Sequence, residues 1–102
     1  MLMDDIFNSC SHEKVAQAAV ACIGGVFADR VRHVAADRGM TPGALAASAV
    51  RRFDQTASGD ARDILRRALR GTDQPVLQGL RLIVEPSLEQ AAERDRAELV
   101  AH

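Results

Sequence analysis

Residues 31–53 of the chain read VRHVAADRGMTPGALAASAVRRF, which is two helix patterns separated by a turn signal. Gly39 is suited to end the first helix, because a left-handed residue just past the last turn satisfies the free carbonyls without a side-chain penalty. Thr41-Pro42 then predicts the start of a second helix, with Thr41 as the N-cap and proline at the first helical position. The buried face of that helix is marked at helical spacing by Leu45, Ala46, Ala49, Val50 and Phe53. This stretch predicts a helical hairpin.

The apolar segment before the hairpin is expected to form a long first helix, or one kinked at Gly24-Gly25. Its apolar residues form two stripes about 100° apart, the first made of Val15, Ala19, Cys22 and Val26, the second of Ile23, Phe27, Val31 and Val34. Because each glycine weakens a helix by about 1 kcal/mol relative to alanine, two helices or a strand and a helix are the alternatives. Whether residues 17–23 are helix or strand stays open. Residues 1–10 are expected to be an N-terminal tail.

The segment after the hairpin predicts further helices. Ser58 is suited to cap a helix that runs to Arg70, and Pro75 to start another. The buried positions expected on these two helices are Ile64, Leu65, Ala68, Leu69, Val76, Leu77, Leu80, Ile83 and Val84. Pro86 is expected to interrupt the last helix, leaving residues 87–102 as a terminal helix or tail. No run alternates apolar and polar residues, so we predict an all-α single domain, residues 1–102, of about five helices.

The composition favours oligomerisation. Of the 102 residues 47% are hydrophobic, but many are alanine, and only three Phe and no Trp or Tyr are present to fill a core. A first helix with apolar stripes on two sides is more than one monomer is expected to cover. We therefore predict a symmetric homodimer whose interface contains Val15, Cys22, Phe27 and Val31.

The charges are unevenly distributed although the net charge is only −1. Residues 27–70 carry nine Arg against five Asp, a local excess of +4, whereas residues 1–26 and 71–102 come to −2 and −3. A basic segment of this kind is typical of a surface that attracts anions such as nucleic-acid phosphates.

Residues 31–53 resemble the two helices and glycine turn of ribbon-helix-helix regulators, and less closely those of helix-turn-helix proteins. The first resemblance implies that the start of the second helix, at Thr41 and Gly43, binds a DNA phosphate through its free amides. Arg51 and Arg52 would add positive charge. The resemblance to ribbon-helix-helix regulators also implies a base-reading strand before the first helix, where residues 17–23 offer one polar side chain, Gln17.

No catalytic or cofactor motif is evident. Cys10, His12 and Cys22 match no zinc spacing, and the sequence contains no phosphate-binding glycine loop, no motif with paired catalytic carboxylates and no serine nucleophile signature. We expect a protein that is not an enzyme and has no cofactor and no metal. Met1 to Phe7 lacks the charge of a secretory leader, and the apolar stretch Val15 to Phe27 is too short to cross a bilayer of about 30 Å. The prediction is a cytoplasmic protein with reduced thiols and no membrane segment.

Three hypotheses follow. The first is a small non-catalytic, homodimeric DNA-binding transcriptional regulator with a basic surface from residues 27–70. The second is an all-α protein–protein interaction module that uses an apolar groove or an arginine-rich face. The third is a helical bundle that shelters an apolar small molecule. A continuous basic face would favour nucleic acid, whereas dispersed arginines would favour the interaction module.

Overall fold

A computed structural model describes the backbone of residues 2–101 and the side chains of residues 6–90. Over this part of the chain it contains six helices and no strand: α1 (Leu2–Cys10), α2 (Glu13–Ile23), α3 (Gly25–Asp37), α4 (Pro42–Thr56), α5 (Gly59–Leu69) and α6 (Pro75–Ala101). The all-α class is confirmed, while the number of helices is six rather than about five.

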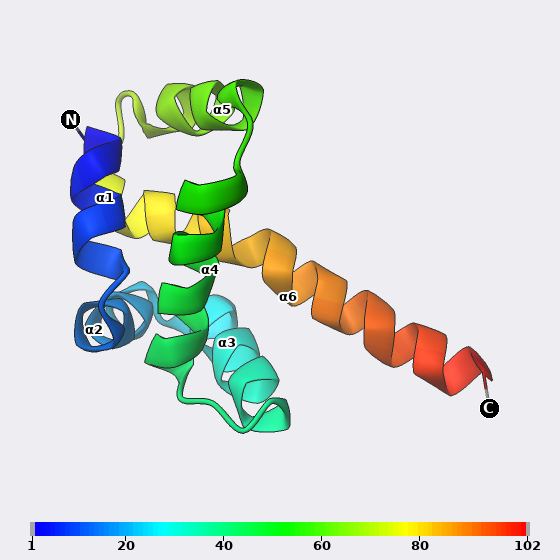
Figure 1. Ribbon diagram of the computed structural model, residues 1–102. Coiled ribbons are helices and arrows are strands. Elements are labelled where there is room, and N and C mark those ends of the chain that lie inside the picture. Colours follow the sequence, from blue (N-terminus) through cyan, green and yellow to red (C-terminus); the bar gives the residue numbers. More distant parts are fainter. Residues whose placement is uncertain (1, 102) are drawn as a thin grey trace.

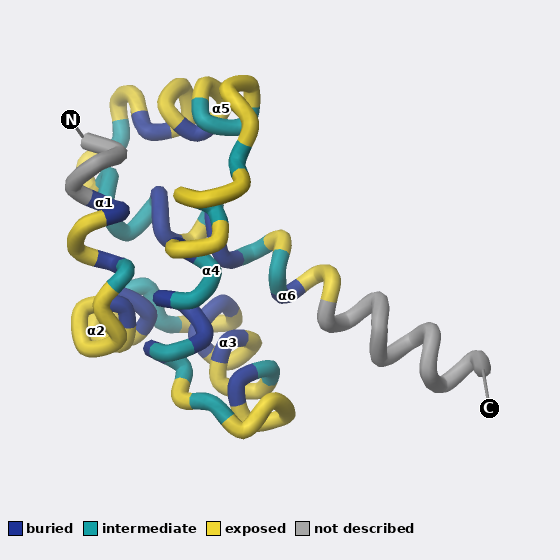
Figure 2. The backbone as a smooth tube through the Cα atoms, in the orientation of Figure 1, coloured by how far each residue is buried: buried dark blue, intermediate teal, exposed yellow. Residues whose placement is uncertain are grey.

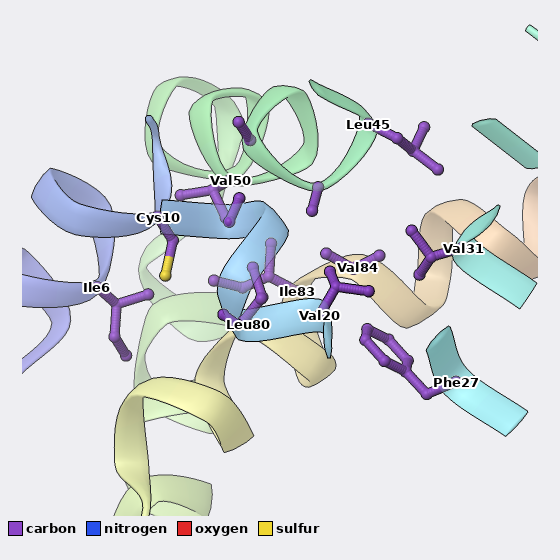
Figure 3. Packing of buried hydrophobic residues seen from close by; sticks show 14 of the residues in the cluster. Ile6, Cys10, Val20, Phe27, Val31, Leu45, Val50, Leu80, Ile83 and Val84 are labelled. Atoms are coloured by element: carbon purple, nitrogen blue, oxygen red, sulfur yellow. The ribbon is translucent and has the colours of Figure 1, made fainter. Parts of the chain in front are cut away.

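The first half of α6 is the centre of the fold, because each of the other five helices packs against it. Figure 1 shows α4 crossing α6, with α3 and α5 at opposite ends of α4. Leu80, Val84 and Leu88 of α6 are almost completely buried. Figure 3 shows Val84 beside Val20 and Val31, which come from α2 and α3. A helix surrounded in this way buries more than one face, which its apolar sequence permits.

The hairpin predicted from residues 31–53 is confirmed. Gly39 has φ +67°, and the N–H of Met40 donates to the Ala35 carbonyl at 2.8 Å, so the end of α3 is closed by a left-handed glycine as expected. At the start of α4 the Thr41 hydroxyl accepts from the N–H of Ala44 at 3.0 Å. Both ends of the turn are therefore determined by residues within a few positions along the chain.

The expectation of one long first helix is wrong. The chain breaks at Gly24, which has φ +64° and ψ −159°, and Gly25 has φ +60°. A right-handed helix cannot continue through residues with positive φ, and glycine adopts such angles without a Cβ clash. Residues 17–23 lie inside α2, so the choice between helix and strand is resolved as helix.

The expected N-terminal tail is instead helix α1, and it belongs to the core. Ile6 and Cys10 are 0% exposed. The Phe7 ring lies 5.9 Å from that of Phe53 in α4, and the Arg62 guanidinium of α5 lies 5.4 Å from the Phe7 ring centroid. Ile6, Cys10 and Leu80 all belong to the buried cluster drawn in Figure 3. Apolar residues at positions 6, 7 and 10 cover one face of a helix, and the start of α6 supplies the surface that buries it.

Pro86 does not interrupt α6, which runs from Pro75 to Ala101. Residues 87–101 are thus a continuation of the central helix rather than a separate element. Because proline has no N–H, the Leu82 carbonyl lacks its usual donor four residues later. Because Pro86 is exposed, the missing hydrogen bond lies at the outside of the packed body.

Candidate functional site

The start of α4, predicted to bind phosphate, is occupied by the chain itself. The N–H of Gly43 donates to Oε1 of Gln17 at 2.6 Å, and the Thr41 hydroxyl donates to Oε1 of Glu13 at 2.6 Å. The hydroxyl also caps the N–H of Ala44. Two of the amides that would face an anion therefore already have partners, and the Glu13 carboxylate adds negative charge beside them. In this structure the helix start is a packing contact with α2.

Gly43 is required by how closely α4 approaches α2. A Cβ built at this position would lie 2.5 Å from the backbone oxygen of Glu13 and 2.8 Å from Cβ of Gln17. The position is buried, so a side chain has no free direction to take. The sequence analysis placed Gly43 at a binding site, whereas the structure gives it a role in helix packing.

Arg51 and Arg52 have different surroundings. Nη1 of Arg51 donates to the Ser11 carbonyl at 2.7 Å, which ties α4 to the turn between α1 and α2. Arg52 is exposed at the edge of a surface groove. Arg51 therefore contacts the α1–α2 turn, whereas Arg52 lies at the groove.

The other arginines of residues 27–70 are also dispersed. Those of α3 and α5 lie at opposite ends of α4 (Figure 1). Several pair with acids of the same neighbourhood: Arg32 with Asp29, Arg66 with Asp63 at 2.7 Å, and Arg62 with Asp54 at 3.6 Å. Pairs of this kind are solvated and reduce the local field that an anion would feel. The basic excess along the sequence is therefore divided between separate surfaces.

The four residues predicted for a dimer interface divide into two pairs. Phe27 and Val31 are 6% and 0% exposed and belong to the core of their own chain (Figure 3). That part of the interface prediction is wrong, because the turn at Gly24 directs the second apolar stripe toward α6 and α4. Val15 is 43% exposed and Cys22 is exposed, so these two remain at the surface.

An apolar groove lies where α5 and the end of α4 meet α6. Its inner part has a volume of about 240 Å³ and is lined by Phe53, Ala61, Ile64, Leu65, Ala68, Leu82 and Ile83. Its outer part, of about 310 Å³, shares Phe53, Leu82 and Ile83 and adds Ala49, Arg52, Thr56, Pro86, Ser87 and Gln90. Because they share Phe53, Leu82 and Ile83, the two parts lie next to each other along α6, and the polar side chains belong to the outer part. We call the two parts together the apolar groove.

Ile64 at the edge of the apolar groove is 66% exposed. The helical spacing predicts that it is buried beside Leu65 and Leu69, and only these two are buried. Ala68 on the same helix is also exposed and Ala61 is half-buried, and Figure 2 shows most of α5 exposed, with its buried residues on the side that faces the other helices. The sequence shows that the helix has a wide apolar stripe, but it does not show which part of that stripe the rest of the chain leaves uncovered.

A second hollow, of about 450 Å³, is mostly polar and lies between the end of α2 and the start of α6. Cys22 lines it with Thr72, Asp73, Gln78 and Arg81 among others. Nε of Arg81 donates to Oε1 of Glu85 at 2.7 Å, and no histidine lines the hollow to serve as a base for the thiol. The other cysteine, Cys10, is buried, and burial raises the pKa of its thiol, which disfavours the reactive thiolate.

Among the residues that the structure describes, no group of three or more His, Cys, Asp or Glu is placed to hold a metal ion. None of the described helices combines the length and the apolar character that crossing a bilayer requires.

No protein-family model matches this chain, and no curated protein or solved structure shows a significant match to it. The shape and chemistry of the apolar groove are therefore the basis of the function proposed next.

Proposed function

We propose that this protein is a non-catalytic interaction module that binds an amphipathic helix of a partner protein in the apolar groove. The observation that carries the proposal is the exposure of Ile64 beside the inner part of the apolar groove, which is almost entirely apolar. Leaving a large aliphatic side chain in water forgoes about 1.5–3 kcal/mol of burial. A partner that covers it recovers that free energy.

The dimensions of the apolar groove favour a helix over a small molecule. Along α6 the lining residues run from Leu82 to Gln90, which is about 12 Å at 1.5 Å per residue. The apolar groove is open along its length rather than closed around a ligand. Two turns of an amphipathic helix, with anchors three and four residues apart, fit such a surface.

The side chains of the apolar groove favour binding over catalysis. Among the described residues that line it, Arg52 is the one ionisable group, and the Thr56 hydroxyl donates to the Arg52 carbonyl at 2.7 Å. General acid–base chemistry needs a group that titrates near neutral pH, and arginine does not. Arg52 is instead suited to pair with a carboxylate at one end of the bound helix.

A peptide titration tests this proposal. The probe is a helical peptide of about 18 residues with leucines at i, i+3, i+4 and i+7 and glutamates on the opposite face. Protein is used at a concentration at which it sediments as a monomer. Ile64→Glu is expected to weaken peptide binding at least about tenfold, since it replaces a buried aliphatic contact by a charge.

The matched control is Val26→Glu, the same kind of substitution at an aliphatic residue of α3 that is 75% exposed and far from the apolar groove. It is expected to change the dissociation constant less than about twofold. Equal binding by parent and Ile64→Glu, or equal loss in both variants, would contradict the proposal.

DNA binding is the competing candidate, and the α3–α4 hairpin that carries the resemblance is the observation in its favour. Because the arginines are dispersed and the start of α4 is occupied, we expect no measurable association with mixed-sequence duplex DNA at about 50 mM salt, where electrostatic association is strong. Fluorescence anisotropy over a salt series is the measurement. Binding that weakens with salt, with a log–log slope reduced by about one unit in Arg52→Ala, would favour the DNA-binding candidate instead.

A further inference from the structure

Helix α6 continues well beyond the packed body. Leu88 is 1% exposed and is followed by the exposed Glu89 and Gln90. From there the backbone remains helical to Ala101 and projects away from the other five helices (Figure 1). We call residues 91–101 the α6 arm. An isolated helix of this length is marginal in water, so a helix that projects in this way is expected to gain stability by packing on a surface.

The apolar groove ends where the α6 arm begins. Its lining residues on α6 finish at Gln90, and the arm starts at residue 91. The groove covers about 12 Å of α6, and the eleven residues of the arm span about 16 Å, enough to fill it. Six of those eleven residues are Ala, Leu or Val. One chain therefore carries an apolar groove and a projecting helix next to each other and of matching length.

We propose that the partner helix is the α6 arm of a second copy of this chain. A twofold axis near Gln90 would place two α6 helices antiparallel, so that each arm enters the apolar groove of the other copy. Such an interface is self-complementary, as a closed dimer requires. It covers the apolar groove and the α6 arm of both chains at once. The inference rests on the proposed function, since it names the partner of the same groove.

The acidic and basic groups are compatible with this arrangement. The sequence of the arm has three acids and two arginines, and the groove it enters contributes Arg52. Near the axis the groove contributes the uncharged Ser87 and Gln90, while the exposed Glu89 beside Gln90 also lies close to the axis.

Cross-linking tests the axis directly. In a Cys22→Ser background, Gln90→Cys is expected to form a disulfide-linked dimer on mild oxidation, because residue 90 faces its own copy across the axis. The parent is the control: its exposed Cys22 lies on α2, away from the axis, and is expected to give no linked dimer. Linkage of the parent through Cys22 would overturn the inference, since it would place the contact on α2.

Sedimentation tests the occupant. The parent is expected to be a dimer, and Ala97→Pro, which breaks the arm helix without touching residues 6–90, should raise the dimer dissociation constant about a hundredfold. Ile64→Glu should act in the same direction and Val26→Glu should not. A parent that is monomeric at about 100 µM but still binds the leucine–glutamate peptide through Ile64 would overturn the second copy as partner and leave the proposed function intact. A parent that neither dimerises nor binds the peptide would overturn both the second copy as partner and the proposed function.

Discussion

Replacing Gly43 by leucine is expected to destabilise the fold by at least about 3 kcal/mol. A Cβ at this position would lie 2.5 Å from the backbone oxygen of Glu13, and backbone cannot move aside as a flexible side chain can. Overpacking of a core typically has a destabilising effect of 1–3 kcal/mol, and separating α4 from α2 would also break the Gly43–Gln17 hydrogen bond. The measurement is urea unfolding followed by circular dichroism.

Gly59→Leu is the matched control for this prediction. Gly59 stands at the first position of α5, and a Cβ there meets nothing within 4 Å. We expect its unfolding free energy to stay within about 0.5 kcal/mol of the parent. Similar midpoints for Gly43→Leu and Gly59→Leu would show that α2 and α4 do not approach as closely as described.

Ile6→Ala is expected to reduce the unfolding free energy by about 2–5 kcal/mol, the range found for removal of a buried aliphatic side chain. Ile6 is fully buried, and its Cδ1 would lie 2.5 Å from a Cβ at Gly79, so it packs directly on the start of α6. Thermal or urea unfolding of the full chain measures the effect.

The exposed Asn8 on the same helix provides the comparison. Asn8→Ala is expected to change stability by no more than about 0.5 kcal/mol. If Ile6→Ala were as mild as Asn8→Ala, residues 1–10 would behave as the tail that the sequence predicts, and α1 would not belong to the core. The two variants thus separate the sequence-based expectation from the structure.

The two destabilising variants also define the conditions for the functional tests. Both act on contacts of α2, α1 or the first half of α6, while the apolar groove is built by α4, α5 and the segment of α6 from Leu82 onward. Ile64→Glu changes an exposed side chain and is expected to leave the unfolding free energy close to that of the parent. A loss of binding in that variant is then a property of the groove rather than of folding.

Local signals in the sequence determined the hairpin. Gly39 ends α3 with positive φ, and Thr41 caps α4, because these contacts join residues three to five positions apart. The cap of α5 by Ser58, whose hydroxyl accepts from the N–H of Ala61 at 3.1 Å, follows the same rule. The core positions of α6 were also predictable, since Leu80, Ile83 and Val84 repeat at helical spacing and are buried.

Tertiary structure alone decided which apolar surfaces are covered. Val15 and Val31 carry the same kind of signal in the sequence, yet Val31 is fully buried and Val15 is 43% exposed. The difference arises from the direction in which α3 leaves the break at Gly24. Ile64 and Ile6 show the same effect in opposite senses. Ile64 is expected in the core but lies at the surface, whereas Ile6 is expected in a tail but lies in the core. Helical spacing tells which residues share a face, but what covers that face depends on helices distant in the sequence, here the first half of α6.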